Sequence, residues 1–139
     1  MIHIVTGADG FIGSNLLMGL ERVIDRNEDQ LVAVDHHTDQ YVWMFKGLTC
    51  LSPKELTHHL AAGHLGRCTV YHQGAITDTT STDVAAMTRE NIEYTKTLLE
   101  ACEYSGSRLV YASSAAVYGD GSRGFVDASD DYEPMNAYA

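Results

Sequence analysis

The feature that most constrains the fold is a glycine-rich turn placed directly after a short apolar run. Residues 2–6 read IHIVT, a β-branched run without polar alternation, as expected of a strand buried on both faces of a parallel sheet. The next segment carries Gly7, Gly10 and Gly13, and from Ile12 the apolar residues recur at helical spacing to about Ile24. A G-x-x-G-x-x-G turn between a strand and a helix predicts a site for the pyrophosphate of a dinucleotide, with an ordinary glycine-rich turn as the alternative.

Short apolar runs and helical periodicities alternate along the rest of the chain. Further strands are predicted at 31–35, 49–51, 67–72 and 108–112. One helix is predicted to begin after Ser52, because Pro53 and Glu55 follow it as N1 and N3 residues. A longer helix is predicted over 84–104, ending at Gly106, along the stripe Val84, Thr88, Asn91, Thr95, Leu98 and Cys102. This order predicts an α/β fold with a doubly wound parallel sheet of the Rossmann type, and a surface loop over 119–133.

Length, charge and cysteine usage exclude several classes of protein. A chain of 139 residues can bury one core, and no apolar run approaches the roughly 20 residues that span a bilayer. We expect neither a membrane span nor a secretory signal. The net charge of −10, without a Lys/Arg cluster, disfavours a nucleic-acid partner. The three cysteines, Cys50, Cys68 and Cys102, form no C-x-x-C pair, which favours reduced thiols in a cytoplasmic protein.

Polar residues at the predicted strand ends are the candidates for a site. Asp35 ends the second predicted strand, and its distance from Gly13 is close to the roughly 20 residues expected of a carboxylate that bonds an adenosine ribose. Ser113 and Ser114 follow the strand at 108–112. The histidine groups at 36–37 and at 58, 59 and 64 lack convincing ligand spacing with carboxylates, so no metal site is predicted.

Four motifs occur in the same order and at similar spacing in one known family. They are TGADGFIGSN at 6–15, Asp35, SSAAVYG at 113–119 and P-x-N-x-Y at 134–138. Over essentially its whole length the chain therefore resembles the extended short-chain dehydrogenases/reductases that modify nucleotide sugars. Within that superfamily, the ADP-L-glycero-D-manno-heptose 6-epimerases are most similar in the segments HQGA at 72–75, TT at 79–80, Asn91, YTK at 94–96 and YASSAA at 111–116.

The resemblance implies a cofactor, a substrate and a set of residues. The cofactor would be NADP, with NAD as the alternative, bound by Gly7, Gly10, Phe11, Ile12, Gly13, Asp35, His36, Lys54, Gln73, Gly74, Ala75, Ile76, Thr77 and Asn91. Tyr138 would take a proton from the substrate, and Ser114 would orient the nascent carbonyl. The substrate would be a nucleotide sugar, oxidised transiently at carbon 6 and reduced on the opposite face by a cytoplasmic homo-oligomer. Ser113 would have a structural role, whereas Asn91 would support the cofactor site. Thr88 and Thr95, on the same helical stripe as Asn91, are expected to be packing residues.

Two departures from the family pattern modify these expectations. The family motif is Y-x-x-x-K, whereas only Ala139 follows Tyr138, so residues 1–139 are expected to be an NAD(P)-binding Rossmann domain, cut within that motif, without a C-terminal substrate domain and inactive alone. The loop at 36–42 also lacks the lysine that meets a 2′-phosphate, so Asp35 and Asp39 favour a free hydroxyl unless Lys46 or Lys54 replaces it. Another nucleotide-sugar epimerase or dehydratase, or a non-catalytic dinucleotide-binding fragment, remains the alternative function.

Overall fold

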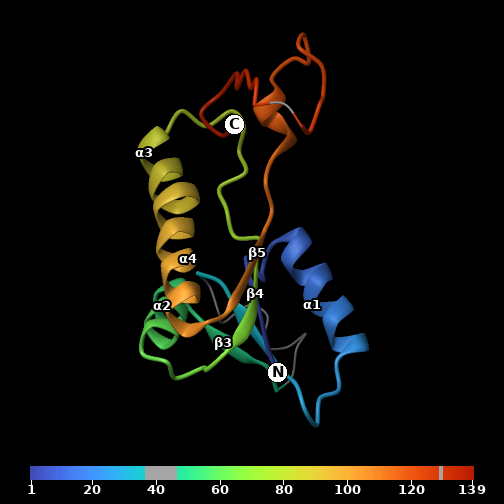
Figure 1. Cartoon of the computed structure of the whole chain (residues 1–139), viewed down its shortest axis with the longest axis vertical. Helices are drawn as coiled ribbons and strands as arrows, with labels where there is room; N and C mark the ends of the chain where they lie inside the picture. Colours follow the sequence, from blue (N-terminus) through green and yellow to red (C-terminus); the bar gives the residue numbers. More distant parts are fainter. Residues whose placement is uncertain (37–46, 129) are drawn as a thin grey trace.

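The fold is built on one parallel sheet. The computed structural model describes residues 1–36, 47–128 and 130–139. In this described part the sheet has five strands in the order β3-β2-β1-β4-β5. They are β1 (Ile2–Thr6), β2 (Gln30–Val34), β3 (Thr49–Leu51), β4 (Cys68–His72) and β5 (Arg108–Tyr111). All pairings are parallel, so the predicted fold class is confirmed, and the strands diverge with their usual twist (Figure 1).

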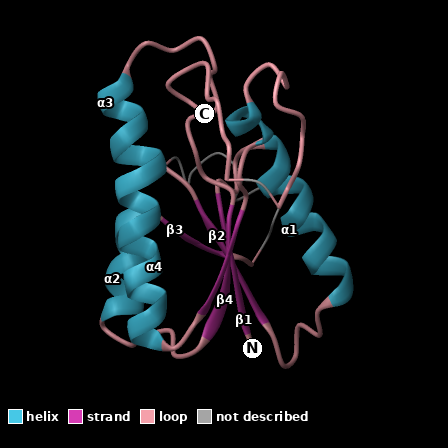
Figure 2. Ribbon diagram, turned by 45° about the horizontal axis from the view of Figure 1, so that its top comes forward, coloured by secondary structure: helices cyan, strands magenta, loops and turns pink. Residues whose placement is uncertain are grey.

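Helices cover both faces of this sheet. One face is covered by α1 (Phe11–Val23), and the other by α2 (Pro53–Ala61) and a longer helical column (Figure 2). The column consists of α3 (Val84–Met87), a π-helical segment η1 (Thr88–Glu93) and α4 (Tyr94–Ser105). Two apolar clusters form the core. Leu17 packs with Val5 and Ala33 on the α1 side, whereas Leu56 and Leu98 pack with Ile4 on the other.

Local sequence signals account for where several elements begin and end. The Ser52 side chain accepts a hydrogen bond from the Glu55 N–H at 3.3 Å, and the Glu55 carboxylate accepts one from the Ser52 N–H at 2.7 Å. This is the predicted capping box, and it begins α2 one residue after Ser52. At the other end of the column, Gly106 adopts a φ of +66° and terminates α4, as predicted.

The helix predicted over 84–104 is present, but its buried stripe was placed incorrectly at the N-terminal end. Val84 is 58% exposed, whereas Met87, outside the predicted stripe, is 3% exposed. The reason is η1, because a π-helical segment inserts an extra residue into the turn and shifts the helical phase on its N-terminal side. Beyond η1 the stripe is confirmed, and Leu98 and Cys102 are buried.

The last strand and the segment after it differ from the rest of the sheet. β5 lies at the sheet edge, with Val110 and Tyr111 exposed by 41% and 61%. A short 3-10 helix, η2 (Ala115–Tyr118), follows it and was not predicted. Within 119–133 the described residues form no helix or strand, in agreement with the predicted loop, and the Tyr118 ring contacts the rings of Phe125 and Tyr132.

Candidate functional site

The glycine turn brings β1 and α1 against the segment that follows β4. Gly7 has a φ of +64°, and a Cβ atom there would lie 2.7 Å from Gly74 Cα. A Cβ atom on Gly13 would lie 2.0 Å from the Gly7 carbonyl oxygen, so the absence of a side chain at Gly13 lets the first turn of α1 approach the glycine turn. Gly10 provides no side-chain cap for α1, and the first turn carries no acidic residue. The N-terminus of a 13-residue helix is therefore left available to an anion.

The glycine turn opens into a cleft of about 590 Å³ at the carboxyl ends of β1, β2 and β4. Twelve of the predicted cofactor-binding residues line it together: Gly7, Gly10, Phe11, Ile12, Gly13, Asp35, His36, Gln73, Gly74, Ala75, Ile76 and Thr77. Five further lining residues were not predicted, namely Thr6, Asp9, Pro53, Glu90 and Tyr94. Of these, Glu90 and Tyr94 come from the helical column on the far side of the cleft, and no local pattern places them there.

The end of the cleft next to β2 is rich in carboxylates. Asp35 accepts hydrogen bonds from the backbone N–H groups of Asp9 at 2.8 Å and of His36 at 2.7 Å, so it holds the glycine turn to the end of β2. Glu90 lies 3.8 Å from the His36 Nε2 atom and accepts a hydrogen bond from Arg89 at 2.8 Å. With Asp9, three carboxyl groups line this end of the cleft. The negative charges of these carboxylates make this end of the cleft electrostatically unfavourable to a phosphate.

A second cavity of about 450 Å³ adjoins the cleft and contains the two predicted catalytic side chains, Ser114 and Tyr138. Residues 73–75 and 77 line both cavities, so this segment is their common wall. Ser114 is the N-cap of η2, and its Oγ accepts a hydrogen bond from the Ala116 N–H at 3.1 Å. Because that bond uses a lone pair, the Ser114 proton remains available to donate to a ligand.

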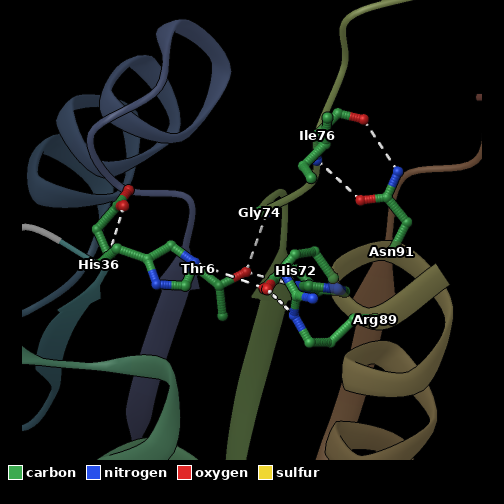
Figure 3. Close-up of polar contacts among 9 residues, drawn as sticks. Thr6, His36, His72, Gly74, Ile76, Arg89 and Asn91 are labelled. Carbon is green, nitrogen blue, oxygen red and sulfur yellow. Dashed lines mark hydrogen bonds and ion pairs between the residues drawn. The ribbon is translucent and has the colours of Figure 1, made fainter. Parts of the chain in front are cut away.

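Asn91 lines the second cavity and holds the wall segment in place (Figure 3). Its Oδ1 accepts from the Ile76 N–H at 2.8 Å, and its Nδ2 donates to the Ile76 carbonyl at 2.9 Å. The side chain thus pairs with both backbone groups of one residue, much as a neighbouring strand would. The hydrogen bonds of the Asn91 side chain are therefore structural. The segment that they hold in place is the one that lines both cavities.

Behind the wall, His72 makes a hydrogen bond to Thr6 at 2.6 Å and another to Thr95 at 2.9 Å. Burial lowers the pKa of His72, which favours the neutral ring. Its edge contacts the ring of Tyr94 at a centroid distance of 5.6 Å. The expectation that Thr95 only packs was therefore wrong. A histidine on the inward face of a buried strand was the available signal, because a buried imidazole needs partners.

Several predicted residues lie apart from these two cavities. Lys54 lines a neighbouring hollow of about 370 Å³ that it shares with His36 and Ser52. His37, Asp39, Lys46 and the loop over 37–42 lie outside the described residues. The rings of His58, His59 and His64 lie 5.5 to 6.1 Å apart. Within 1–36, 47–128 and 130–139, no three histidine, cysteine or acidic side chains are arranged to hold a metal ion.

Comparisons with known proteins agree with this architecture. The sequence profile of the NAD dependent epimerase/dehydratase family matches residues 3–139. Among solved structures, ADP-L-glycero-D-manno-heptose-6-epimerase from Helicobacter pylori aligns over 99% of this chain and 46% of its own, with 24% identity and a TM-score of 0.79. UDP-glucuronic acid 4-epimerase from Bacillus cereus, in complex with NAD, aligns over 99% and 47%, with 28% identity and a TM-score of 0.78.

A third solved structure, UDP-glucose 4-epimerase from Thermus thermophilus in complex with NAD, has 26% identity and a TM-score of 0.76. It aligns over 99% of this chain and 46% of its own. The chain thus spans about half the length of the structures it matches. None of the helices that the structure describes is long and apolar enough to cross a membrane.

Proposed function

Because the chain belongs to the NAD-dependent epimerase/dehydratase family, we propose that it is the cofactor-binding N-terminal part of a nucleotide-sugar epimerase. The observation that carries this proposal is the shared wall at 73–77, which joins the glycine turn on one side to Ser114 and Tyr138 on the other. A ligand that follows this wall would have a phosphate at the turn and a reacting group in the second cavity.

The residues at the glycine turn fit a dinucleotide. The absent Cβ atoms of Gly7 and Gly13 let the turn pack closely against Gly74 and against the start of α1, and the uncapped N-terminus of α1 offers N–H groups to a pyrophosphate. Asp35 keeps acceptor capacity beyond its two backbone bonds, which suits a ribose hydroxyl. When bound, the dinucleotide would supply a hydride acceptor and donor.

The proposed chemistry needs one proton acceptor and one hydrogen-bond donor in the second cavity. Tyr138, as the phenolate, would accept the proton of the substrate hydroxyl as the carbon loses hydride, and would return that proton after reduction on the opposite face. Ser114 would donate a hydrogen bond to the oxygen that becomes a carbonyl, because its hydroxyl proton remains available while its oxygen accepts from the Ala116 N–H. These roles account for why both side chains line one cavity.

For the substrate we propose an ADP-activated heptose that is epimerised at carbon 6. The support is the set of short segments at 72–75, 79–80, 91–96 and 111–116 that resemble the 6-epimerases. The test is to assay the longest protein encoded by the gene with ADP-D-glycero-D-manno-heptose and, separately, with UDP-glucose and UDP-glucuronic acid. Conversion of the heptose alone is expected. Conversion of a UDP-sugar alone would replace this substrate with that of another epimerase, and binding of NAD without any conversion would favour a dinucleotide-binding module.

For the cofactor, the 2′ position of the adenosine ribose decides between NAD and NADP. A phosphate a few ångströms from the Asp35 carboxylate is repelled by on the order of several kcal/mol at an effective dielectric of about 20. Asp9 and Glu90 add to this repulsion, whereas Lys54 lines a separate hollow. We therefore expect the preference for NADP implied by the resemblance to be weakened or reversed, so that NAD binds at least as tightly at pH 8.

Titration calorimetry with each dinucleotide at pH 6 and at pH 8 tests this expectation. If a protonated histidine at 36 or 37 neutralises the phosphate, NADP affinity is higher at pH 6 than at pH 8, whereas NAD affinity changes little. A strong preference for NADP that does not depend on pH would show that a lysine holds the phosphate. Lys54→Met would then abolish that preference.

A further inference from the structure

Two polar side chains, Thr6 and His72, are buried in the part of the core that the structure describes, with exposures of 2% and 5%. They stand at the carboxyl ends of the neighbouring strands β1 and β4, and their Oγ1 and Nδ1 atoms lie 2.6 Å apart (Figure 3). The chemistry proposed above uses neither of them. A buried histidine requires a partner for each ring nitrogen, and here both partners are hydroxyl groups.

The direction of each hydrogen bond in this group follows from counting protons. The Thr95 hydroxyl donates to the Asn91 carbonyl at 2.7 Å, so its oxygen can only accept from His72 Nε2. In the neutral ring Nδ1 then carries no proton and accepts from the Thr6 hydroxyl. The Thr6 oxygen in turn accepts from the N–H groups of Gln73 and Gly74, each at 3.2 Å. This set of directions gives each proton one position, and it corresponds to the Nε2–H tautomer of His72.

The two ends of this chain of hydrogen bonds both contact the common wall of the two cavities. At one end, Thr6 holds Gln73 and Gly74. At the other end, the chain reaches the backbone of Asn91, whose side chain holds both backbone groups of Ile76. Gln73, Gly74 and Ile76 all line the cleft. The imidazole is thus the link between the two anchors of the wall.

We propose that His72 is a positioning residue for the wall at 73–77, and that only its neutral Nε2–H tautomer keeps both anchors in place. If Nδ1 carried the proton, it would point at a Thr6 oxygen that already accepts two N–H groups, and Thr6 would lose its own acceptor. The titratable side chain in contact with the ring is Tyr94 on α4. Burial of His72 favours the neutral form, in agreement with the proposal. The inference rests on the proposed function only in that this wall is the one a dinucleotide would follow.

The decisive comparison uses two threonines of α4. Thr95 and Thr97 each donate to the carbonyl four residues earlier, at 2.7 and 2.9 Å, but only Thr95 also contacts His72. Thr97→Val is therefore the matched control for Thr95→Val. In the 139-residue chain, nitrogen NMR of the imidazole is expected to show the Nε2–H tautomer for the wild type and Thr97→Val, and a shift towards Nδ1–H for Thr95→Val. Amide exchange at Gly74 is expected to quicken by about tenfold or more in Thr95→Val alone.

A second pair of variants tests the other end of the chain. Thr6→Ser keeps the hydroxyl and is expected to retain the affinity for NAD within about threefold. Thr6→Val is expected to lose about tenfold or more, since it leaves the Gly74 N–H and the His72 Nδ1 atom without their partner and leaves the Gln73 N–H only its 3.3 Å bond to the Thr6 carbonyl. An Nδ1–H tautomer in the wild type, or unchanged exchange at Gly74 in Thr95→Val, would overturn the inference. Equal affinity of Thr6→Val and the wild type for NAD would do the same. If the wild type binds no dinucleotide, the proposed function fails, while the tautomer and the exchange rates still decide the role of His72.

Discussion

At the scale of single residues, the three glycines of the turn contribute differently to folding and to binding. A Cβ atom would lie 2.0 Å from a backbone oxygen at Gly13, but 3.2 Å from one at Gly10. The first distance requires the backbone to move, whereas the second requires only a small shift. The fold therefore tolerates a side chain at Gly10 better than at Gly13, and we expect the requirement for glycine at position 10 to come from the proposed dinucleotide.

We predict that Gly13→Ala lowers the free energy of unfolding by about 1–3 kcal/mol or more, as expected for overpacking against backbone, and that Gly10→Ala lowers it by less than about 1 kcal/mol. Urea denaturation of the two variants measures this difference. Gly10→Val is expected to remain folded and to abolish dinucleotide binding, because its side chain occupies the approach to the helix N-terminus. Unchanged NAD affinity in folded Gly10→Val would mean that the turn is only structural.

Residue patterns along the chain predicted the glycine turn and the capping box, because each depends on neighbours within a few positions. Asp35 was predicted from its spacing of roughly 20 residues from the turn. Twelve of the predicted residues do line one cleft, which follows from the rule that parallel strands end at one edge. The bonds between Thr6, His72 and Thr95 could not be predicted in this way, since they depend on how β1, β4 and α4 are registered against one another. This register is set by contacts between segments far apart in the chain, so a pattern over neighbouring residues does not reveal it.

At the scale of elements, η1 shows how one irregular segment can set the geometry of a site. It places Asn91 opposite Ile76 and brings Glu90 to the cleft. The predicted buried stripe assumes an uninterrupted α-helix, in which residues three and four positions apart stay on one face along the whole length. Helical periodicity is read as an average over many residues, so it does not reveal a single extra residue within a turn.

The capping box of α2 gives a prediction at this scale. Ser52→Ala removes the acceptor for the Glu55 N–H and is expected to lower the free energy of unfolding by about 1 kcal/mol. Thr57→Ala, which removes a hydroxyl within the same helix, serves as a control. The Thr57 hydroxyl donates to two carbonyls of its own helix, those of Pro53 and Lys54, and caps no N–H group. Thermal unfolding followed by circular dichroism compares the two. An effect of Ser52→Ala no larger than that of the control would contradict the assigned cap.

At the scale of the whole molecule, the buried titratable groups make stability depend on pH from two directions. Burial lowers the pKa of His72 below its usual 6.5. On the alkaline side, burial raises the pKa of the Cys102 thiol to about 11 and also raises the pKa of Tyr94 well above its usual 10. The Tyr94 hydroxyl is buried without a hydrogen-bond partner among the described residues. All three groups are therefore neutral in the folded protein at pH 7.

We predict that the free energy of unfolding is highest between about pH 7 and pH 9. Below about 6.5 the unfolded chain binds a proton at His72 that the folded protein does not bind, so stability falls with falling pH. Above about 9 the unfolded chain releases protons that Cys102 and Tyr94 retain when folded, so stability falls with rising pH. Urea denaturation between pH 5 and pH 10 checks both limbs. His72→Gln should remove the acid limb near pH 6, and a profile that keeps this limb would assign it to another group.

The position of β1 has a consequence for the nascent chain. β1 precedes the other four strands in the chain and is therefore translated before them. It lies at the centre of the sheet, where it pairs with β2 and with β4. At about 5–20 residues per second, synthesis leaves this β-branched segment without its second neighbour for several seconds after it leaves the ribosome. During that interval the strand is a candidate client for chaperones. Of the five strands, the one that is synthesised first is thus the one that waits longest for its second neighbour.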